Sequence, residues 1–247
     1  MSKTNEASKP ESIFLMKECV KTFGVLKAAI IADVMFWIIQ DKEPWIKAQK
    51  HADWFHVNEK TIRSNSKGLA KHGCFGRRIS HLKNGKQGAC KYFPVKQPNY
   101  RTIYNFYYAM FNNNNPNSDL GKFTGGDSEV REVANFVTFP LLYIEEIGDV
   151  TTAYILTKLY WITFSKDPSL IIRYRSKTRF SHAMHLDRNT AMRHLKWLSE
   201  NGYVDYIDYD SGIKITVQEN NFLYSIMQNL IEVSQQKRND GIMDKFN

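Results

Sequence analysis

Apolar residues recur at helical spacing in two separate segments, and polar residues fill the positions between them. The apolar positions are Val57, Ile62 and Leu69 in the first segment, and Leu186, Ala191, Leu195 and Leu198 in the second. An amphipathic helix buries such a stripe and exposes its polar residues. Asn58 and Asp187 suit helix N-termini, and Gly73 and Gly202 suit the position just past a C-terminus. The pattern predicts one helix over residues 58–72 and another between Asp187 and Gly202.

The two helical segments belong to a longer internal repeat. Residues 57–73 align with residues 186–202 without a gap, and residues 24–38 align with residues 148–162. Self-similarity over such lengths predicts two copies of one structural unit.

The segments around each predicted helix follow a common order. Residues 26–40 read as a buried helix, 45–47 as a short strand and 48–55 as a helix, whereas 13–23 fit either a strand or a helix. Hairpins are predicted over 75–95, with Asn84-Gly85 at the turn, and over 203–217. The Asn-Gly pair accepts the positive φ angles of a tight turn. Amphipathic helices are predicted over 100–111 and 222–233.

In a winged helix-turn-helix module, helices are followed by a β-hairpin. The sequence therefore predicts an α+β fold, mostly α, with two such domains in tandem. The expected divisions are a disordered tail over 1–12, a first domain over 13–111, a linker over 112–136, a second domain over 137–233 and a C-terminal tail over 234–247. A chain of 247 residues is long enough for two cores of this size.

Positive charge is concentrated in the first copy. The formal net charge is +9, yet residues 1–111 carry 19 Lys and Arg against 8 Asp and Glu, whereas residues 137–247 carry 13 of each. The neutral second half still holds a basic segment over 173–196, in which Asp187 is the only acid. A basic surplus on selected elements indicates a polyanionic partner.

The chemistry of the predicted helices favours base recognition in duplex DNA. The second helix of a helix-turn-helix enters the major groove by its N-terminal half, where Arg can bind guanine and Asn can bind adenine. The candidate base-reading residues are Lys60, Thr61 and Arg63 in the first copy, and Arg188, Asn189 and Arg193 in the second. Glu59 has two readings, because it could accept from cytosine or stabilise the N-terminus of its own helix.

Phosphate contacts are expected from the remaining cations of the same elements. The candidates are Lys67, Arg77, Arg78, Lys83, Lys86 and Lys91 in the first copy, and Arg175, Lys177, Arg179 and Lys196 in the second. The predicted hairpin of the first copy, which would be its wing, carries no acid. The second carries Asp205, Asp208 and Asp210, so we expect it to stay off the DNA or to contact protein.

Catalytic and metal-dependent alternatives find little support. The pair His182 and His185, and the set His72, Cys74 and Cys90, lack the paired spacing of a zinc site. Tyr104, Tyr107 and Tyr108 could supply a nucleophile, but no metal motif accompanies them, and no phosphate-binding glycine loop is present. We therefore expect no enzymatic activity, no metal, no cofactor and no small-molecule substrate.

The expected location is the cytoplasm. Three cysteines without a CxxC pair favour a reduced setting, and the first residues do not form a signal peptide. The apolar run over 28–39 contains Asp33 and is too short to span a bilayer, so no membrane partner is expected.

Residues 186–204, Leu-Asp-Arg-Asn-Thr-Ala-Met-Arg-His-Leu-Lys-Trp-Leu-Ser-Glu-Asn-Gly-Tyr-Val, resemble the winged-helix signature of bacterial and phage regulators. Residues 136–161 are similar to the opening of phage replication-organiser proteins, and two winged helices in one chain resemble plasmid replication initiators. The resemblance implies a sequence-specific double-stranded DNA-binding protein of a mobile element, acting as an origin-binding replication initiator. A transcriptional repressor with the same readout and a protein-interaction scaffold are the alternatives. Partners beyond DNA would be a second copy of the chain or a replication protein.

Overall fold

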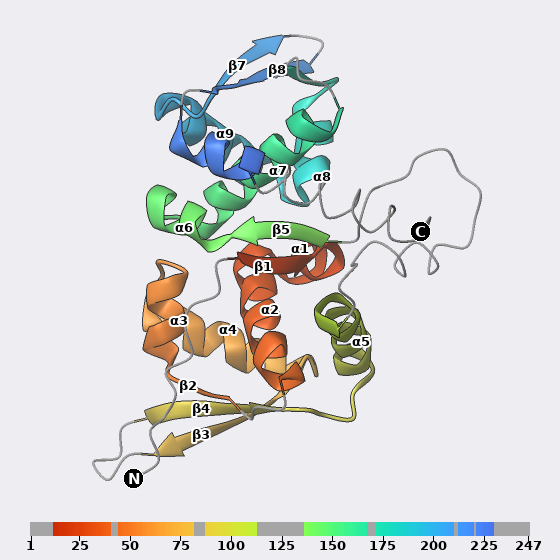
Figure 1. Ribbon diagram of the computed structural model, residues 1–247, viewed down its shortest axis with the longest axis vertical. Helices are drawn as coiled ribbons and strands as arrows, with labels where there is room; N and C mark the ends of the chain where they lie inside the picture. Colours follow the sequence, from red (N-terminus) through yellow and green to blue (C-terminus); the bar gives the residue numbers. More distant parts are fainter. Residues whose placement is uncertain are drawn as a thin grey trace, which may run out of the picture. The chain divides into compact units, whose positions relative to one another are not determined.

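The computed structural model describes residues 12–40, 44–81, 87–112, 136–166, 171–209, 212–219 and 221–229. These residues form a mostly helical α+β protein with small antiparallel sheets (Figure 1), which confirms the α+β, mostly helical part of the predicted fold class. The chain divides into two compact units, Met1–Val150 and Thr151–Asn247, which are called unit 1 and unit 2 below.

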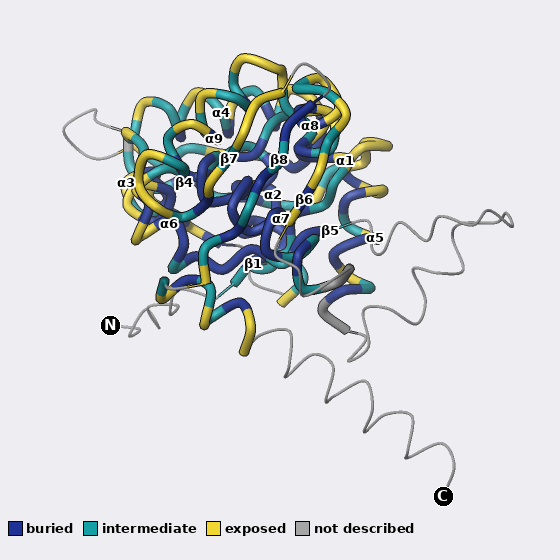
Figure 2. Tube along the Cα trace, turned by 90° about the horizontal axis from the view of Figure 1, so that it is seen from above, coloured by how far each residue is buried: buried dark blue, intermediate teal, exposed yellow. Residues whose placement is uncertain are grey.

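Unit 1 opens with a strand and two helices. Strand β1 (Ser12–Met16) leads into α1 (Lys17–Phe23), so residues 13–23 contain both of the elements that the sequence allowed. Gly24, at φ 84°, then joins α1 to α2 (Val25–Ile39), and its N–H donates to the Val20 carbonyl at 2.8 Å. Most residues of α2 are buried (Figure 2), as expected for a helix that is apolar on nearly all sides.

The next elements of unit 1 carry most of the candidate DNA contacts. They are β2 (Trp45–Ile46), α3 (Ala48–Trp54), α4 (Glu59–Lys71), β3 (Gly76–His81), β4 (Gln87–Phe93) and α5 (Pro98–Asn112). Strand β4 lies between β2 and β3, and both pairings are antiparallel. After α4 the chain turns through Gly73, at φ 71°, and the Cys74 N–H closes the helix on the Leu69 carbonyl at 3.1 Å.

Two elements that the sequence assigned to the second domain pack in unit 1. Strand β5 (Phe136–Pro140) pairs with β1 in antiparallel register, with Phe14 opposite Thr138, and α6 (Leu141–Ile147) follows it. From α5, the Tyr107 hydroxyl donates to the Phe14 carbonyl at 2.8 Å. The division therefore falls at Val150 rather than near 137, because backbone hydrogen bonds hold β5 against β1.

Unit 2 repeats the order of helix, edge strand, two helices and hairpin. Its elements are α7 (Val150–Lys166), β6 (Ile171–Tyr174), α8 (Lys177–Met184), α9 (Arg188–Glu200), β7 (Val204–Tyr209) and β8 (Gly212–Val217). Strand β8 is central, as β4 is in unit 1. The chain is helical again over 222–229, and the Tyr160 hydroxyl donates to Asn221 Oδ1 at 2.9 Å just before this segment.

Several sequence-based assignments lie outside the described residues. These are the turn residues Asn84 and Gly85, the cations Lys83 and Lys86, Asp210 in the second hairpin, most of the predicted linker, the tails over 1–11 and 234–247, and the end of the last predicted helix.

Candidate nucleic-acid interface

Helices α4 and α9 begin with the same side-chain cap. Asn58 Oδ1 accepts from the backbone N–H of Thr61 at 2.7 Å and from its hydroxyl at 2.9 Å. In α9, Asp187 Oδ1 accepts from the Thr190 N–H at 2.9 Å. Both predicted N-caps are confirmed. The Thr61 hydroxyl also donates to Asn58, so a base contact in which this hydroxyl donates would replace that hydrogen bond and leave the backbone cap in place.

Both helices bury one face and expose a matching polar stripe. Ile62 and Leu69 of α4 are buried, as are Ala191, Leu195 and Leu198 of α9, which confirms the core positions predicted for them. The exposed stripe of α4 consists of Lys60, Ser64, Lys67 and Lys71, and that of α9 consists of Asn189, Arg193, Lys196 and Glu200. Residues three and four apart lie on one side of a helix. These two sets, at equivalent repeat positions, are called the exposed stripes below.

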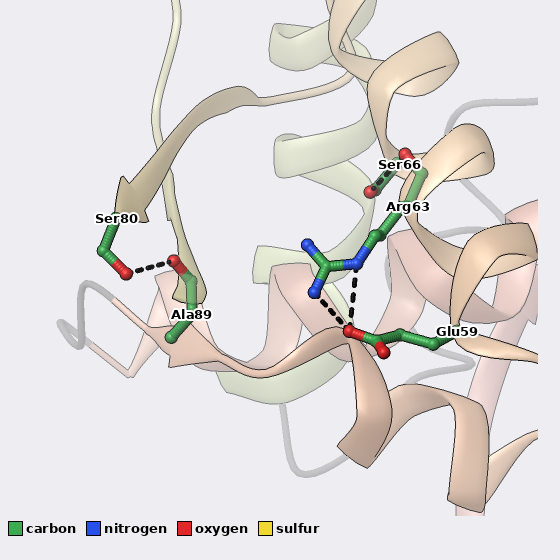
Figure 3. A network of polar contacts seen from close by, with 5 residues as sticks. All are labelled: Glu59, Arg63, Ser66, Ser80 and Ala89. Carbon is green, nitrogen blue, oxygen red and sulfur yellow. Dashed lines mark hydrogen bonds and ion pairs between the residues drawn. The ribbon is translucent and has the colours of Figure 1, made fainter. Parts of the chain in front are cut away.

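Arg63 does not belong to the exposed stripe of α4. Its Nε donates to Glu59 Oε1 at 2.9 Å, a second guanidinium nitrogen donates to the same oxygen, and both side chains are only partly exposed. Figure 3 shows the guanidinium extending from α4 toward the side of the β3–β4 hairpin. The sequence analysis considered Glu59 as a cytosine acceptor or as a stabiliser of its helix N-terminus, and it did not predict this ion pair. Arg63 would have to leave the ion pair to contact a base.

The corresponding positions in α9 hold no such pair. Arg188 and Met192 occupy the repeat positions of Glu59 and Arg63, so α9 has no carboxylate one turn away to engage its first arginine. Arg188 and Asn189 are both exposed in the first turn. The hydrogen bond between His194 Nδ1 and Thr152 Oγ1, at 2.7 Å, holds α9 on α7. Arg188 and Asn189 are therefore exposed at the start of a helix that is hydrogen-bonded to α7.

The two adjacent arginines of β3 have different surroundings. Arg77 is half-buried, and its Nε donates to Cys90 Sγ at 3.2 Å, whereas Arg78 is exposed. Burial raises the pKa of the Cys90 thiol, and the Arg77 charge and hydrogen bond act against that rise. Alternate residues of a strand point to opposite faces. Of this pair, Arg78 is the one available to phosphate, and Lys91 on β4 is half-buried.

In unit 2 the candidate phosphate contacts lie around the start of α8. Arg175 and Arg179 are exposed, and the Ser176 hydroxyl caps α8 by accepting from the Arg179 N–H at 3.1 Å. Lys177 instead forms an ion pair with Asp208 of the second hairpin, and both side chains are partly exposed. The sequence carries no signal for this pairing, because the two residues are far apart along the chain.

Lys196 of α9 has a carboxylate one turn away. Its Nζ lies 3.5 Å from Glu200 Oε1, and the two side chains are 66% and 59% exposed. Solvent and salt screen such a pair, which contributes little to stability. The pair therefore leaves Lys196 able to exchange its partner for a phosphate.

The tyrosines considered as nucleophiles are part of the packing of α5. Tyr107 is fully buried against β1, and burial raises the pKa of its hydroxyl well above the usual range. The Tyr104 ring stacks between Tyr100 and Tyr108, with centroid distances of 5.5 and 5.6 Å. These contacts account for the aromatic run as a structural feature.

Within the described ranges, no three His, Cys, Asp or Glu side chains gather closely enough to hold an ion. Cys19, Cys74 and Cys90 are buried free thiols.

No protein-family model matches the chain, and no curated sequence matches it significantly. None of the helices in the described ranges combines the length and the apolar character needed to cross a membrane.

Proposed function

We propose that the chain is a sequence-specific double-stranded DNA-binding protein built from two winged helix-turn-helix modules. The observation that carries the proposal is the pair of exposed stripes on α4 and α9, at equivalent repeat positions of two capped helices. Each helix is preceded by a short helix and followed by a hairpin. A single helix fits the major groove, and a polar stripe beginning in its first turn meets the base edges there.

The two modules contribute unequally to sequence recognition. In α9, Arg188, Asn189 and Arg193 are exposed and suited to guanine and adenine. In α4, Arg63 is held by Glu59 and Thr61 by its cap, which leaves Lys60 as the exposed base-reading candidate. Helix α9 supplies most of the discrimination between sequences, and α4 mainly supplies affinity.

Phosphate binding is distributed over both modules. Lys67 and Arg78 are exposed in unit 1, as are Arg175 and Arg179 in unit 2. Cations at the start of α8 stand next to the partial positive charge of a helix N-terminus, where folding alone does not favour them. A bound phosphate would offset the repulsion between these cations and the helix N-terminus, because both the side chains and the helix end attract an anion.

Within this proposal the protein serves a mobile element as an origin-binding replication initiator. Support comes from the resemblance of residues 136–161 to phage replication organisers and of the tandem modules to plasmid initiators. A transcriptional repressor would use the same contacts. Recovering bound fragments from the source replicon separates the two roles, because an initiator selects repeats beside an AT-rich stretch and a repressor selects a site within a promoter.

A protein-binding role has one specific observation in its favour. Strand β7 exposes Ile207 and Tyr209 to 51% and 47%, and Asp205 lies on the same strand. An apolar and acidic hairpin is repelled by phosphate and suits a protein surface. The second hairpin is accordingly the place where a second copy or a replication protein would bind while α9 remains on DNA.

The proposal is tested by the affinity of Arg188→Ala for a selected duplex and for a random duplex, measured by fluorescence anisotropy. Loss of a bidentate base contact weakens the selected duplex by about 1–3 kcal/mol and the random duplex much less. Arg101→Ala, which removes an exposed cation from α5, is the matched control. Absence of duplex binding by the unmodified chain would refute the proposal, and equal losses on both duplexes would remove the base-reading role of Arg188.

A further inference from the structure

One face of the β2–β4–β3 sheet is turned away from the helices of unit 1. Ile46, Cys90 and Tyr92 point to the side on which α2 and α4 pack, and all three are buried. Figure 1 places the labelled helices of unit 1 on that side of the sheet. The opposite side is called the outer face below.

A tryptophan and two cations form one cross-strand row on the outer face. Trp45 is opposite Lys91, and Lys91 is opposite Arg78, so the three side chains share one side of the sheet. The Trp45 side chain is 52% exposed, and Arg78 is exposed as well. Lys47 follows Trp45 by two residues with extended backbone angles and is also exposed. The exposed Trp45 side chain therefore has two cations in its own row and a third two residues further along the chain.

A second aromatic side chain lies on the same face. Phe93 is two residues beyond Lys91 on β4, which places it diagonal to Trp45 across the strand pair. Its ring occupies the space above Gly76, where an added Cβ would be only 2.2 Å from the Phe93 ring. Glycine at position 76 thus allows Phe93 to lie across β3 and widens the aromatic part of the outer face.

The sheet of unit 2 provides an internal comparison. Strands β2, β3 and β4 contain no Asp or Glu within their described bounds. On the unit 2 sheet, the row equivalent to Trp45, Lys91 and Arg78 runs from Arg173 through Lys214 to Ile207. Arg173 thus occupies the edge-strand place that Trp45 has in unit 1, and the neighbouring row, from Ile171 through Thr216, ends on the carboxylate of Asp205. The unit 2 row therefore has two cations without the tryptophan, and a carboxylate lies beside it.

We propose that the outer face of the β2–β4–β3 sheet binds single-stranded DNA, with Trp45 and Phe93 stacking on unpaired bases. Lys47, Arg78 and Lys91 bind the phosphates. Base–aromatic stacking and a cationic track are the two components of sequence-tolerant single-strand binding. Duplex DNA does not provide the same partner, because its bases already stack on one another and show only their edges in the grooves. This site is separate from the exposed stripes of α4 and α9.

The test uses the full chain and a fluorescein-labelled oligothymidylate of about 12 nucleotides, a length within the usual range of single-strand sites. Trp45→Ala is expected to weaken binding at least about fivefold, which is the lower end of the effect of removing one stacking ring. Trp45→Phe keeps a stacking ring and is expected to retain most of the affinity. Ile171→Ala, which removes an exposed apolar side chain from the edge strand of the other sheet, should leave the affinity unchanged.

A second variant changes a residue of β3, so its result does not depend on whether a substitution of Trp45 disturbs β2. Arg78→Ala removes an exposed cation and should reduce the slope of log affinity against log salt by about 0.7, the value for one phosphate contact on a single strand. Thermal unfolding of each variant checks that it is folded. The proposal is refuted if folded Trp45→Ala binds oligothymidylate as the unmodified chain does, or if it loses duplex and single-strand affinity equally.

Two further outcomes separate this inference from the duplex proposal and from a protein-binding face. Failure of all duplex binding, with Trp45-dependent oligothymidylate binding intact, would overturn the proposed function and leave this inference standing. A change in the sedimentation of Trp45→Ala without a change in oligothymidylate affinity would assign the outer face to contact between copies of the chain, which also overturns it.

Discussion

His51 Nε2 lies 2.6 Å from Asp33 Oδ2, and both side chains are almost completely buried. The contact joins the middle of α2 to α3, the helix that precedes α4. Unit 2 makes a different polar connection between the equivalent helices, because Lys158 Nζ of α7 donates to the Ala183 carbonyl of α8. In each unit a buried or partly buried polar contact thus joins the shorter helix to the long helix.

The Asp33–His51 pair should behave as a coupled unit in stability measurements. Removing one partner strands the other in the core, so Asp33→Ala and His51→Ala should each lower the free energy of unfolding by about 3–5 kcal/mol. The double variant should lose clearly less than the sum of the two. Urea unfolding of the four proteins measures the coupling, and additive losses would show that the contact contributes nothing of its own.

The two N-caps should differ in their response to acid. Hydrogen bonds from Thr190, first from its side chain and then from its backbone N–H, lower the pKa of Asp187 below its ordinary value of 3.8. The cap is therefore complete at neutral pH and is lost as pH falls below 3.8 through the lowered pKa. Asp187→Asn should unfold at the same temperature near pH 7 and lose less stability in acid.

Asn58→Asp is the converse variant, because it introduces an ionisable cap in α4. Its melting temperature should become more acid-sensitive than that of the unmodified chain. An Asp187→Asn protein with an unchanged acid response would show that this cap makes no pH-dependent contribution.

Glu59→Gln distinguishes the roles considered for this carboxylate. Loss of the negative charge beside Arg63 should raise affinity for all duplexes by a similar factor, because it removes repulsion from phosphate. Binding to duplexes that differ at single positions provides the measurement. If preference for cytosine at one position relaxes, Glu59 reads that base rather than only holding Arg63.

Asp208→Asn should strengthen duplex binding by unit 2. The substitution removes a negative charge and releases Lys177 from its ion pair. One additional phosphate contact steepens the slope of log affinity against log salt by about 0.9 on duplex DNA. Asp205→Asn, on the same strand, is the comparison, because Asp205 has no described contact with α8. Equal effects of both variants would place Lys177 away from the DNA.

Two glycine substitutions should change stability in opposite directions. Gly212, at φ 144°, has no room for a side chain, since an added Cβ would be 2.1 Å from the Tyr174 carbonyl oxygen. Gly212→Ala should therefore destabilise unit 2 through clash and backbone strain. Gly68 lies inside α4 with open space around it, so Gly68→Ala should stabilise unit 1 by about 0.5–1 kcal/mol. Thermal unfolding measures both, and a stable Gly212→Ala protein would contradict the hairpin geometry.

Local patterns in the sequence predicted most of the helices and hairpins. Several of these patterns act over only a few residues and can be read directly from the sequence. They are the caps at Asn58 and Asp187, the apolar spacing of α9 and the glycines at positions 73 and 202. The exposed stripes follow from the same periodicity, which correctly predicts that Lys60 and Arg193 lie on the outside of their helices.

The sequence by itself determined which segments become helices and strands, and which of their faces carry charge, because helical and strand periodicities are local. Tertiary structure decided what each charged or aromatic group meets. It paired β5 with β1, turned Arg77 toward Cys90 and left Arg78 outside, and joined Lys177 to Asp208. These outcomes depend on strand register and on contacts between residues far apart in the chain, where burial and opposite charge act only once the packing has formed.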